Sequence, residues 1–297
     1  MVCVTIPATS ANLGAGFDAL GIAVRLYNEI EVEESDRLVI ESADGVAIPE
    51  DETNLVYTMM RDLHTIYGAQ MPPVHIRQTN RVPIARGLGS SSACVVGALL
   101  AANAMLGGAF SRQELLDIAV RFEGHPDNVA PAFLGGFVCA AQEGDRVRYV
   151  RTELRDDLRF AALIPDFELE TSLARSVLPQ DIPRRDAVHN VSRASLMAMS
   201  LASGQYENLA LAAEDRLHQP YRLHLIEGGA RAMELLREAG AYCAYISGAG
   251  STLMGIVPTA DTGYLARARA MLDAAGYGAW GLLLLEPDNV GAVCAVR

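Results

Sequence analysis

The alternation of apolar and polar residues predicts that the first half of the chain folds into one layered α/β unit. Strand-like segments at residues 2–6, 23–33 and 74–78 precede a glycine-rich loop, and two helical patterns follow it. The second helix opens with the capping-box pattern Ser111 to Glu114. A strand at 137–141 then pairs through a turn at 143–145 with the alternating segment 146–150.

The second half of the chain predicts a unit of a different kind. A strand at 160–164 is followed by a helix-rich stretch from about 185 to 239, strands at 242–246 and 252–257, a helix at 262–275 and a strand at 280–284. The order β-α-β-β-α-β is typical of a ferredoxin-like sandwich. We therefore expect an α+β protein with two domains, residues 1–156 and 157–297.

Composition narrows the classes of partner. Of 297 residues, 51% are hydrophobic and 20% charged, which is ordinary for a globular protein, and the net charge of −12 argues against a nucleic-acid surface. No uncharged apolar run reaches the roughly 18 residues of a membrane span. The five cysteines are odd in number and far apart, so neither a disulfide framework nor a CxxC metal site is indicated. The first residues are strand-like rather than an export signal, and we expect a cytoplasmic protein.

The loop at residues 83–92, together with the apolar helix that it opens, carries the strongest chemical signal. Gly87 and Gly89 lack a Cβ, so backbone N–H groups can approach a ligand closely. Ser90, Ser91 and Ser92 supply hydroxyls and N-cap oxygens at the start of a helix, whose N-terminus favours anions. The loop therefore predicts a polyphosphate site, and the alternative is a turn that only caps a buried helix.

The absence of one residue type sharpens this interpretation. All 24 basic residues are arginine, and the chain contains no lysine. A Walker-type loop and a protein kinase both need a lysine on the phosphates, and Schiff-base chemistry needs an amine. A Walker-type phosphate loop, a protein kinase site and a Schiff-base mechanism are therefore excluded. If the loop binds ATP, backbone dipoles, arginine, hydroxyls and a metal must neutralise the phosphates.

Two further segments combine glycine with polar residues. In residues 7–18, Gly14 and Gly16 permit positive φ, while Asn12 and Asp18 offer an acceptor-rich pocket wall. A simple connecting loop would explain the glycines, but less well the density of polar groups. Residues 246–253 form a glycine-rich turn between two strands, which could be only a hairpin. Beside the other clusters, it predicts another wall of the same cleft.

Residues 123–131 form a third polar cluster. Glu123 ends a predicted helix, where the dipole disfavours a carboxylate by a few tenths to about 1 kcal/mol. A Mg²⁺ shared with ATP would offset that cost, and simple solvation of Glu123 is the alternative. His125 with Asp127 could suggest a transition-metal site. No second histidine lies nearby at ligand spacing, so hydrogen bonding within the segment is favoured.

Together, in this order and over essentially the whole chain, these clusters resemble the GHMP kinase family. The segments 9–18 and 125–131 are most similar to its homoserine kinase branch. The resemblance implies an N-terminal ATP-binding domain like the second domain of ribosomal protein S5, and a ferredoxin-like C-terminal domain. It also implies ATP and Mg²⁺, and the conversion of L-homoserine to O-phospho-L-homoserine in threonine biosynthesis. A homodimer is left open.

The resemblance also assigns roles to residues of this chain. It implies that Ser91 or its neighbour Ser90, together with Glu123, holds the metal. Asn12 and Asp18 would take the substrate ammonium, Arg175 and Arg222 its carboxylate, and Asn128 would orient its hydroxyl. His125, Thr171 and Gly248 complete the implied substrate site. The ATP-binding residues implied are Asn54, Pro83, Ile84, Ala85, Arg86, Gly87, Leu88, Gly89, Ser90, Ser91, Ser92 and Ala93.

The amide at position 128 has a mechanistic consequence. Related sugar and mevalonate kinases place an aspartate base there, and an amide cannot accept a proton at neutral pH. We therefore expect direct phosphoryl transfer without a dedicated general base, driven by positioning and electrostatics. Glu123, Ser91 and Asn128 are the expected catalytic residues, with Arg86 a candidate replacement for a phosphate-binding lysine.

Two alternatives stay open at this point. The chain could be another small-alcohol kinase of the same family, such as a mevalonate or diphosphocytidyl-methylerythritol kinase; Asp18 facing an ammonium would argue against mevalonate. It could also be a nucleotide-sensing or scaffold protein that has lost turnover. The retained Glu123, Ser91, Asn128 and both arginines argue against that loss.

Overall fold

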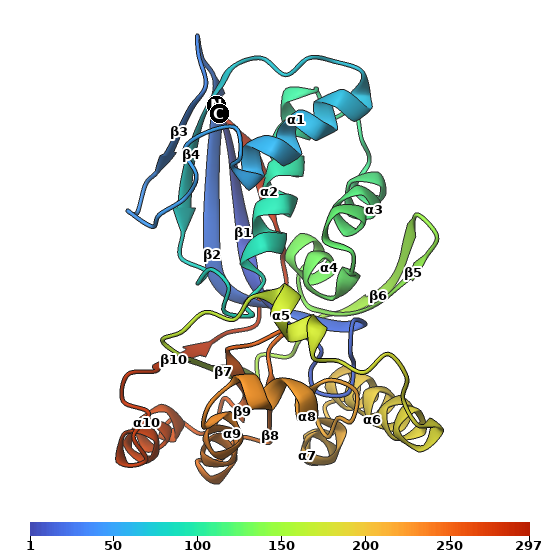
Figure 1. The fold of residues 1–297 in the computed structure, drawn as a ribbon, viewed down its shortest axis with the longest axis vertical. Coiled ribbons are helices and arrows are strands. Elements are labelled where there is room, and N and C mark those ends of the chain that lie inside the picture. The colour runs from blue at the N-terminus through green and yellow to red at the C-terminus, as the bar shows by residue number, and fades with distance from the viewer.

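The computed structural model describes residues 1–297 and contains two β-sheets that form separate layers (Figure 1). The larger sheet has seven strands. Five follow the order β11-β1-β2-β4-β3, while β5 pairs with both β2 and β6. All pairs are antiparallel except β3 with β4. The strands are β1 (Val2–Ala11), β2 (Leu20–Glu34), β3 (Val39–Ser42), β4 (Val74–Asn80), β5 (Phe137–Glu143), β6 (Arg146–Thr152) and β11 (Val293–Val296).

Four helices pack beside this sheet, and they confirm the α/β layer predicted for the first half. They are α1 (Leu55–Tyr67), α2 (Ser90–Met105), α3 (Arg112–Glu123) and α4 (Pro126–Leu134). Helix α2 lies between the other helices and β1, and ten of its 16 residues are buried, which explains why its sequence is apolar on every side. The predicted capping box of Ser111 and Glu114 is present at the start of α3.

The second sheet confirms the ferredoxin-like prediction. Its strands are β7 (Leu158–Ile164), β8 (Cys243–Ile246), β9 (Leu253–Pro258) and β10 (Gly281–Leu285). They run antiparallel in the order β10-β7-β9-β8, so the first and third strands are central. The remaining helices are α5 (Thr171–Ser176), α6 (Arg184–Ser203), η1 (Tyr206–Asn208), α7 (Leu209–Ala212), α8 (Gln219–Arg222), η2 (Leu223–Leu225), α9 (Gly229–Glu238) and α10 (Tyr264–Ala274).

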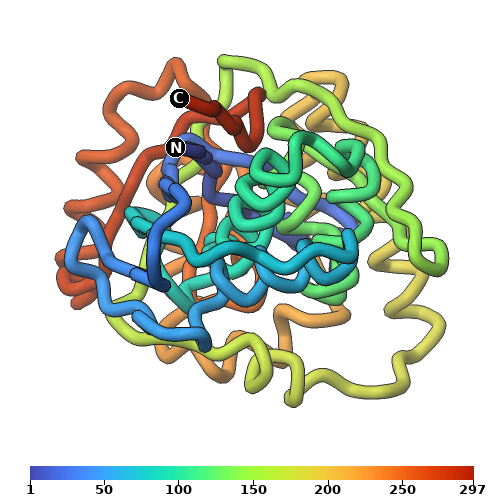
Figure 2. The backbone as a smooth tube through the Cα atoms, turned by 90° about the horizontal axis from the view of Figure 1, so that it is seen from above, coloured from blue at the N-terminus to red at the C-terminus, as the bar shows by residue number.

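The end of the chain returns to the first sheet, which the sequence did not predict. Strand β11 pairs with β1, with Val2 opposite Val296. The two termini therefore lie side by side (Figure 2), and the backbone N–H of Arg297 donates to the carbonyl of Met1 at 2.9 Å. The domain limits 1–156 and 157–297 stay a prediction. They do not account for β11, which lies in the second range but pairs with a strand of the first.

Local structure differs from the sequence-based expectation at two places that matter for chemistry. The N-cap of α2 is Gly89, not a serine, and no side chain caps this helix. Asp127 and Asn128 lie in the first turn of α4, a helix that was not predicted from the sequence, and Pro126 occupies its first helical position. No helix combines the length and apolar character needed to cross a bilayer.

Candidate active site

A polar cleft of about 410 Å³ lies where the loops of the two units meet. Only 2 of its 19 lining residues are hydrophobic. The cleft brings together the glycine loop, the segments 7–18 and 123–131, the helices α5 and α8, and the turn after β8. These elements come from both halves of the chain. The predicted residues that line it are Asn12, Asp18, Ala85, Arg86, Gly87, Gly89, Ser90, Ser91, Ser92, Glu123, His125, Asn128, Thr171, Arg175, Arg222 and Gly248.

Three residues of the predicted ATP loop do not line this cleft or the cavity beside it. Leu88 and Ala93 are fully buried in the hydrophobic core, and Pro83 lines neither cavity. Apolar side chains at positions 88 and 93 anchor the loop and the first turn of α2, while glycine and serine between them face the cleft. These residues can therefore support the loop from behind, but their side chains do not form its surface.

A second cavity of about 520 Å³ adjoins the cleft and shares Ser90, Ser91 and Thr171 with it. Asn54 and Ile84 lie in its wall, together with the apolar residues Ile48 and Val56. The Asn54 side chain is occupied as the N-cap of α1: its Oδ1 accepts from the N–H groups of residues 56 and 57, and its Nδ2 donates to a backbone carbonyl. Its contribution to the cavity is structural in this conformation.

Asn80 at the end of β4 also lines this second cavity, and sequence reasoning missed it. The side chain is 8% exposed, and its Nδ2 has no hydrogen-bond partner in the protein. A buried donor without a partner is rare in proteins and has a free-energy cost. Only the position of Asn80 just before the glycine loop could have pointed to it.

The glycine loop has the geometry that an anion site requires. Gly89 has φ +72°, and a Cβ built on it would lie 2.0 Å from the Thr9 Oγ1. Because no side chain caps α2, its first N–H groups remain available to a ligand at the helix N-terminus. The loop is held from the other unit, where the Ser247 hydroxyl donates to the carbonyl of Gly87 at 2.6 Å. This geometry fits the predicted polyphosphate site.

Arg86 does not present its guanidinium as a lysine replacement in this conformation. Its Nη1 donates to the carbonyl of Pro165 at 3.0 Å, and its Nη2 to that of Asp166 at 3.3 Å. The side chain therefore ties the loop to the segment after β7.

Ser91 and Glu123 meet at the edge of the cleft. The Ser91 hydroxyl donates to Glu123 Oε1 at 2.5 Å, so the end of α3 and the start of α2 present one carboxylate and one hydroxyl together. Oxygen ligands of this kind, with phosphate oxygens and water, are those that Mg²⁺ prefers. The pair fits the predicted metal site, and Glu123 is engaged rather than simply solvated.

The end of the cleft away from the second cavity is formed by charged residues: Asp18, Arg175 and Arg222 line the cleft but not that cavity. The Arg175 guanidinium donates to both carboxylate oxygens of Asp18, at 2.8 and 3.2 Å. Arg222 is 1% exposed, and its Nε donates to the carbonyl of Ala174 and its Nη1 to that of Gly248. Burial, followed by the nearby charge of Arg175, lowers the pKa of Arg222 to about 10, and the side chain remains cationic at neutral pH.

Two residues that sequence reasoning missed support these arginines. Phe17 packs its ring beneath both guanidinium groups, 5.2 Å from that of Arg222 and 5.9 Å from that of Arg175. The His218 ring stacks on Phe17 and places Nδ1 3.2 Å from the Arg222 Nη1. Burial lowers the pKa of His218, so the neutral ring can accept this hydrogen bond. Their only sequence signal was that Phe17 directly precedes Asp18 and that His218 lies four residues before Arg222.

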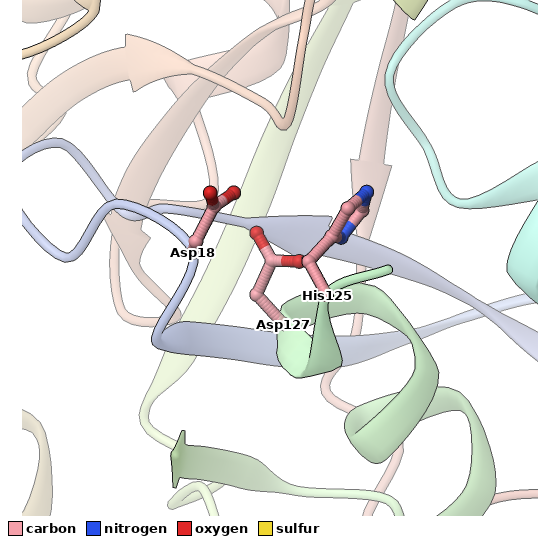
Figure 3. Close-up of side chains that lie close together, drawn as sticks. All are labelled: Asp18, His125 and Asp127. Carbon is pink, nitrogen blue, oxygen red and sulfur yellow. The ribbon is translucent and has the colours of Figure 1, made fainter. Parts of the chain in front are cut away.

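The side chains of Asp18, His125 and Asp127 lie close together, as Figure 3 shows, with one polar atom of each within 4.8 Å of the others. His125 Nδ1 lies 2.6 Å from Asp127 Oδ1, which confirms the hydrogen bond expected within this segment. Burial lowers the pKa of His125, but the hydrogen bond and the charge of Asp127 outweigh burial, and the pKa is raised overall. The cluster offers two carboxylates to a cationic group of a ligand.

Asn128 occupies the middle of the cleft. Its backbone N–H donates to Asp127 Oδ1 at 3.1 Å, and its Oδ1 accepts from the buried Thr9 hydroxyl at 2.8 Å. The structure thus joins β1, the glycine loop and α4 around one amide. Thr9 carried no distinctive sequence signal apart from its place in the cluster 7–18.

Comparison with known proteins agrees with this site. The model of the GHMP kinases N terminal domain matches residues 54–136, and that of the GHMP kinases C terminal domain matches residues 197–278. A protein of Caldicellulosiruptor bescii named homoserine kinase is 43% identical over 98% of this chain and 96% of its own length. The chain belongs to the homoserine kinases of the GHMP kinase family.

Other GHMP kinases support the assignment at sequence and structural level. The homoserine kinase of Clostridium beijerinckii is 42% identical, covering 98% of both chains. A solved structure of a homoserine kinase from Cytophaga hutchinsonii has a TM-score of 0.86 at 27% identity, covering 99% of this chain and 97% of its own. One described as a homoserine kinase of Listeria monocytogenes has a TM-score of 0.83 at 32% identity over the whole of both chains. The α+β, two-unit GHMP kinase fold predicted from the sequence is confirmed.

Proposed function

We propose that this chain transfers the γ-phosphoryl group of ATP to the side-chain hydroxyl of L-homoserine, giving O-phospho-L-homoserine for threonine biosynthesis. One observation carries the proposal. A single cleft presents an uncapped helix N-terminus at one end, and a carboxylate with two guanidinium groups at the other. Homoserine carries an α-carboxylate and an α-ammonium at one end and a hydroxyl at the other, so it matches the distribution of charge.

In this proposal the nucleoside of ATP would occupy the second cavity, and its phosphates would lie on the glycine loop. The cavities share Ser90 and Ser91, so a nucleotide can span both. The apolar wall suits a purine, and the unpartnered Nδ2 of Asn80 supplies a donor for a ring nitrogen. Ser91 and Glu123 would hold Mg²⁺, which would neutralise phosphate charge there.

The substrate zwitterion is placed against the charged end of the cleft. Its carboxylate would take Arg175 and Arg222, because a guanidinium fork matches a planar carboxylate. Its ammonium would take Asp18 and the Oδ1 of Asn12, which already accepts from the backbone N–H of Asp18 at 3.0 Å. The ammonium would thus replace Arg175 in the present ion pair with Asp18. His125 also lines the cleft, and Thr171 lines both the cleft and the second cavity.

The chemical step needs no protein base. A lone pair of the substrate hydroxyl forms the new O–P bond to the γ-phosphorus, and the bond from that phosphorus to the β,γ-bridging oxygen breaks, with its electrons leaving on ADP. The hydroxyl proton passes to an oxygen of the transferred phosphoryl group. Asn128 contributes position and a polar contact rather than basicity, as phosphoryl transfer generally requires.

The experiment is to incubate the purified protein with ATP, MgCl₂ and L-homoserine, and to follow ADP formation and the product by ³¹P NMR. We expect homoserine-dependent ADP and one phosphomonoester resonance. ATP binding without any homoserine-dependent turnover would favour the alternative of a nucleotide-sensing protein.

A further inference from the structure

The hydrogen bond between Thr9 and Asn128 fixes which end of the Asn128 amide faces the cleft. Thr9 is fully buried at the end of β1, and Asn128 is 9% exposed. The Thr9 hydroxyl has Asn128 Oδ1 as its only hydrogen-bond partner, at 2.8 Å. A hydroxyl can also accept, so the sense of this bond has to be argued from its surroundings.

The surroundings favour the sense in which Thr9 donates. If the amide were turned round, the Thr9 hydroxyl would accept from Nδ2 and its own hydrogen would have no acceptor, a costly arrangement for a buried group. The two glycines beside the Asn128 amide support the orientation in which Thr9 donates to Oδ1. A Cβ at Gly89 would lie 3.3 Å from Asn128 Oδ1, whereas one at Gly248, in the cleft wall, would lie 3.8 Å from Nδ2. The Nδ2 group is therefore on the cleft side.

We propose that Thr9 is a positioning residue that holds Asn128 as a hydrogen-bond donor to the reacting hydroxyl. The inference rests on the proposed function. The attacking oxygen has two lone pairs and one hydrogen. One lone pair attacks phosphorus, the second accepts from Asn128 Nδ2, and the hydrogen is left pointing at a phosphoryl oxygen, which receives it. With Oδ1 in the cleft instead, the amide would accept the hydroxyl hydrogen and turn it away from that oxygen.

The backbone of Gly89 packs directly against this hydrogen bond. A Cβ built at Gly89 would lie 2.0 Å from Thr9 Oγ1 and 3.3 Å from Asn128 Oδ1, so a glycine at this position leaves room for the Thr9 hydroxyl beside the amide. Thr9 contributes no surface to the cleft, and it acts only through Asn128. Its loss should therefore alter the rate of transfer rather than the binding of either substrate.

Three variants test the inference. Thr9→Val keeps shape and removes the hydroxyl, Thr9→Ser keeps the hydroxyl, and Thr5→Val makes the same change elsewhere on β1, where the threonine side chain forms no hydrogen bond in the structure. We expect Thr9→Val to lower kcat about 10- to 100-fold, with the KM for homoserine and for ATP changed less than about twofold. Thr9→Ser should restore most of kcat, and Thr5→Val should match the native enzyme.

A double-mutant cycle separates positioning from a general structural effect. In the Asn128→Ala background, Thr9→Val should lower kcat no further, because its effect passes through the amide. Thermal unfolding identifies a variant that fails to fold, and Thr9→Ala then replaces Thr9→Val in the same cycle. Native kcat in the folded Thr9 variant, equal losses for Val and Ser, or additive losses with Asn128→Ala would overturn the inference while leaving homoserine phosphorylation intact. Absence of homoserine phosphorylation by the native protein would overturn both.

Discussion

Arg175 and Asp18 form a bidentate ion pair across the cleft, with N–O distances of 2.8 and 3.2 Å, although they are 157 residues apart in the chain. One side chain comes from the loop after β1 and the other from α5. Each carries the charge complementary to one group of an amino-acid zwitterion. Asp18 and Arg175 therefore neutralise each other in this ion pair. A zwitterionic substrate that enters between them can pair its ammonium with Asp18 and its carboxylate with Arg175.

Replacing Asp18 with Asn should weaken the binding of homoserine specifically. The variant keeps the shape of the side chain but removes the charge that faces the ammonium, and a hydrogen bond to a charged group contributes about 1.5–3 kcal/mol. We expect the KM for homoserine to rise about tenfold to a hundredfold, with the KM for ATP unchanged, in steady-state assays. A parallel rise in both constants would show that Asp18 shapes the cleft as a whole rather than binding the ammonium.

Replacing Arg222 with Lys should cost both binding and stability. An ammonium cannot reproduce the guanidinium contacts to Ala174, Gly248 and His218, nor a planar grip on a carboxylate. We expect a KM for homoserine raised about tenfold or more, and a free energy of unfolding lowered by about 1–3 kcal/mol. Arg175→Lys is the matched control: its half-buried side chain should give a similar KM change with little loss of stability. Native KM in Arg222→Lys would remove Arg222 from the carboxylate site.

Replacing Glu123 with Gln should change the metal dependence. The new amide oxygen can still accept a hydrogen bond from Ser91, but the substitution removes the only carboxylate at the proposed metal site. We expect kcat to fall about a hundredfold or more, and the Mg²⁺ concentration for half-maximal activity to rise. Glu114→Gln, at the other end of the same helix, preserves a capping residue and should behave as native. If the magnesium titration of Glu123→Gln matches the native one, the metal lies elsewhere.

The proton on His125 should stabilise the folded protein on the acid side of neutrality. The raised pKa means that the folded state binds this proton more tightly than the unfolded state, in which the pKa is near 6.5. The stabilisation is complete below that pH and disappears as pH rises through the folded pKa. The difference in free energy of unfolding between the native protein and His125→Gln, from urea titrations, should therefore shrink between pH 5.5 and pH 8.5. A difference that grows over this range would contradict the raised pKa.

The sequence predicted the architecture because the periodic patterns of its strands and helices are strong, and because glycine, serine and acidic residues cluster at the loops that form the cleft. It did not predict the return of β11, since Val293–Val296 is four residues long and its partner β1 lies at the other end of the chain. It assigned Leu88 and Ala93 to the nucleotide surface by their place in a motif, whereas burial places them behind it.

Residues that act through a neighbour were beyond the reach of sequence patterns. Phe17, His218 and Thr9 carry no charge that marks them, and their roles follow from contacts between segments distant along the chain. Asn80 was missed for a related reason: only the burial of its unpartnered Nδ2 distinguishes it from any other strand-end asparagine. The spacing of residues along the sequence identifies side chains that contact a ligand more readily than it identifies the side chains that hold them in position.

The most direct test of the account compares three alcohols as phosphoryl acceptors at equal concentration. L-Homoserine carries both the carboxylate and the ammonium, mevalonate lacks the ammonium, and 3-amino-1-propanol, which is homoserine without its carboxylate, lacks the carboxylate. Because each missing charge leaves Asp18 or the arginines without a partner, kcat/KM for homoserine should exceed that for either analogue by at least about tenfold. In Asp18→Asn the advantage of homoserine over mevalonate should fall, while its advantage over 3-amino-1-propanol persists. Equal or preferred phosphorylation of mevalonate by the native protein would contradict the assignment.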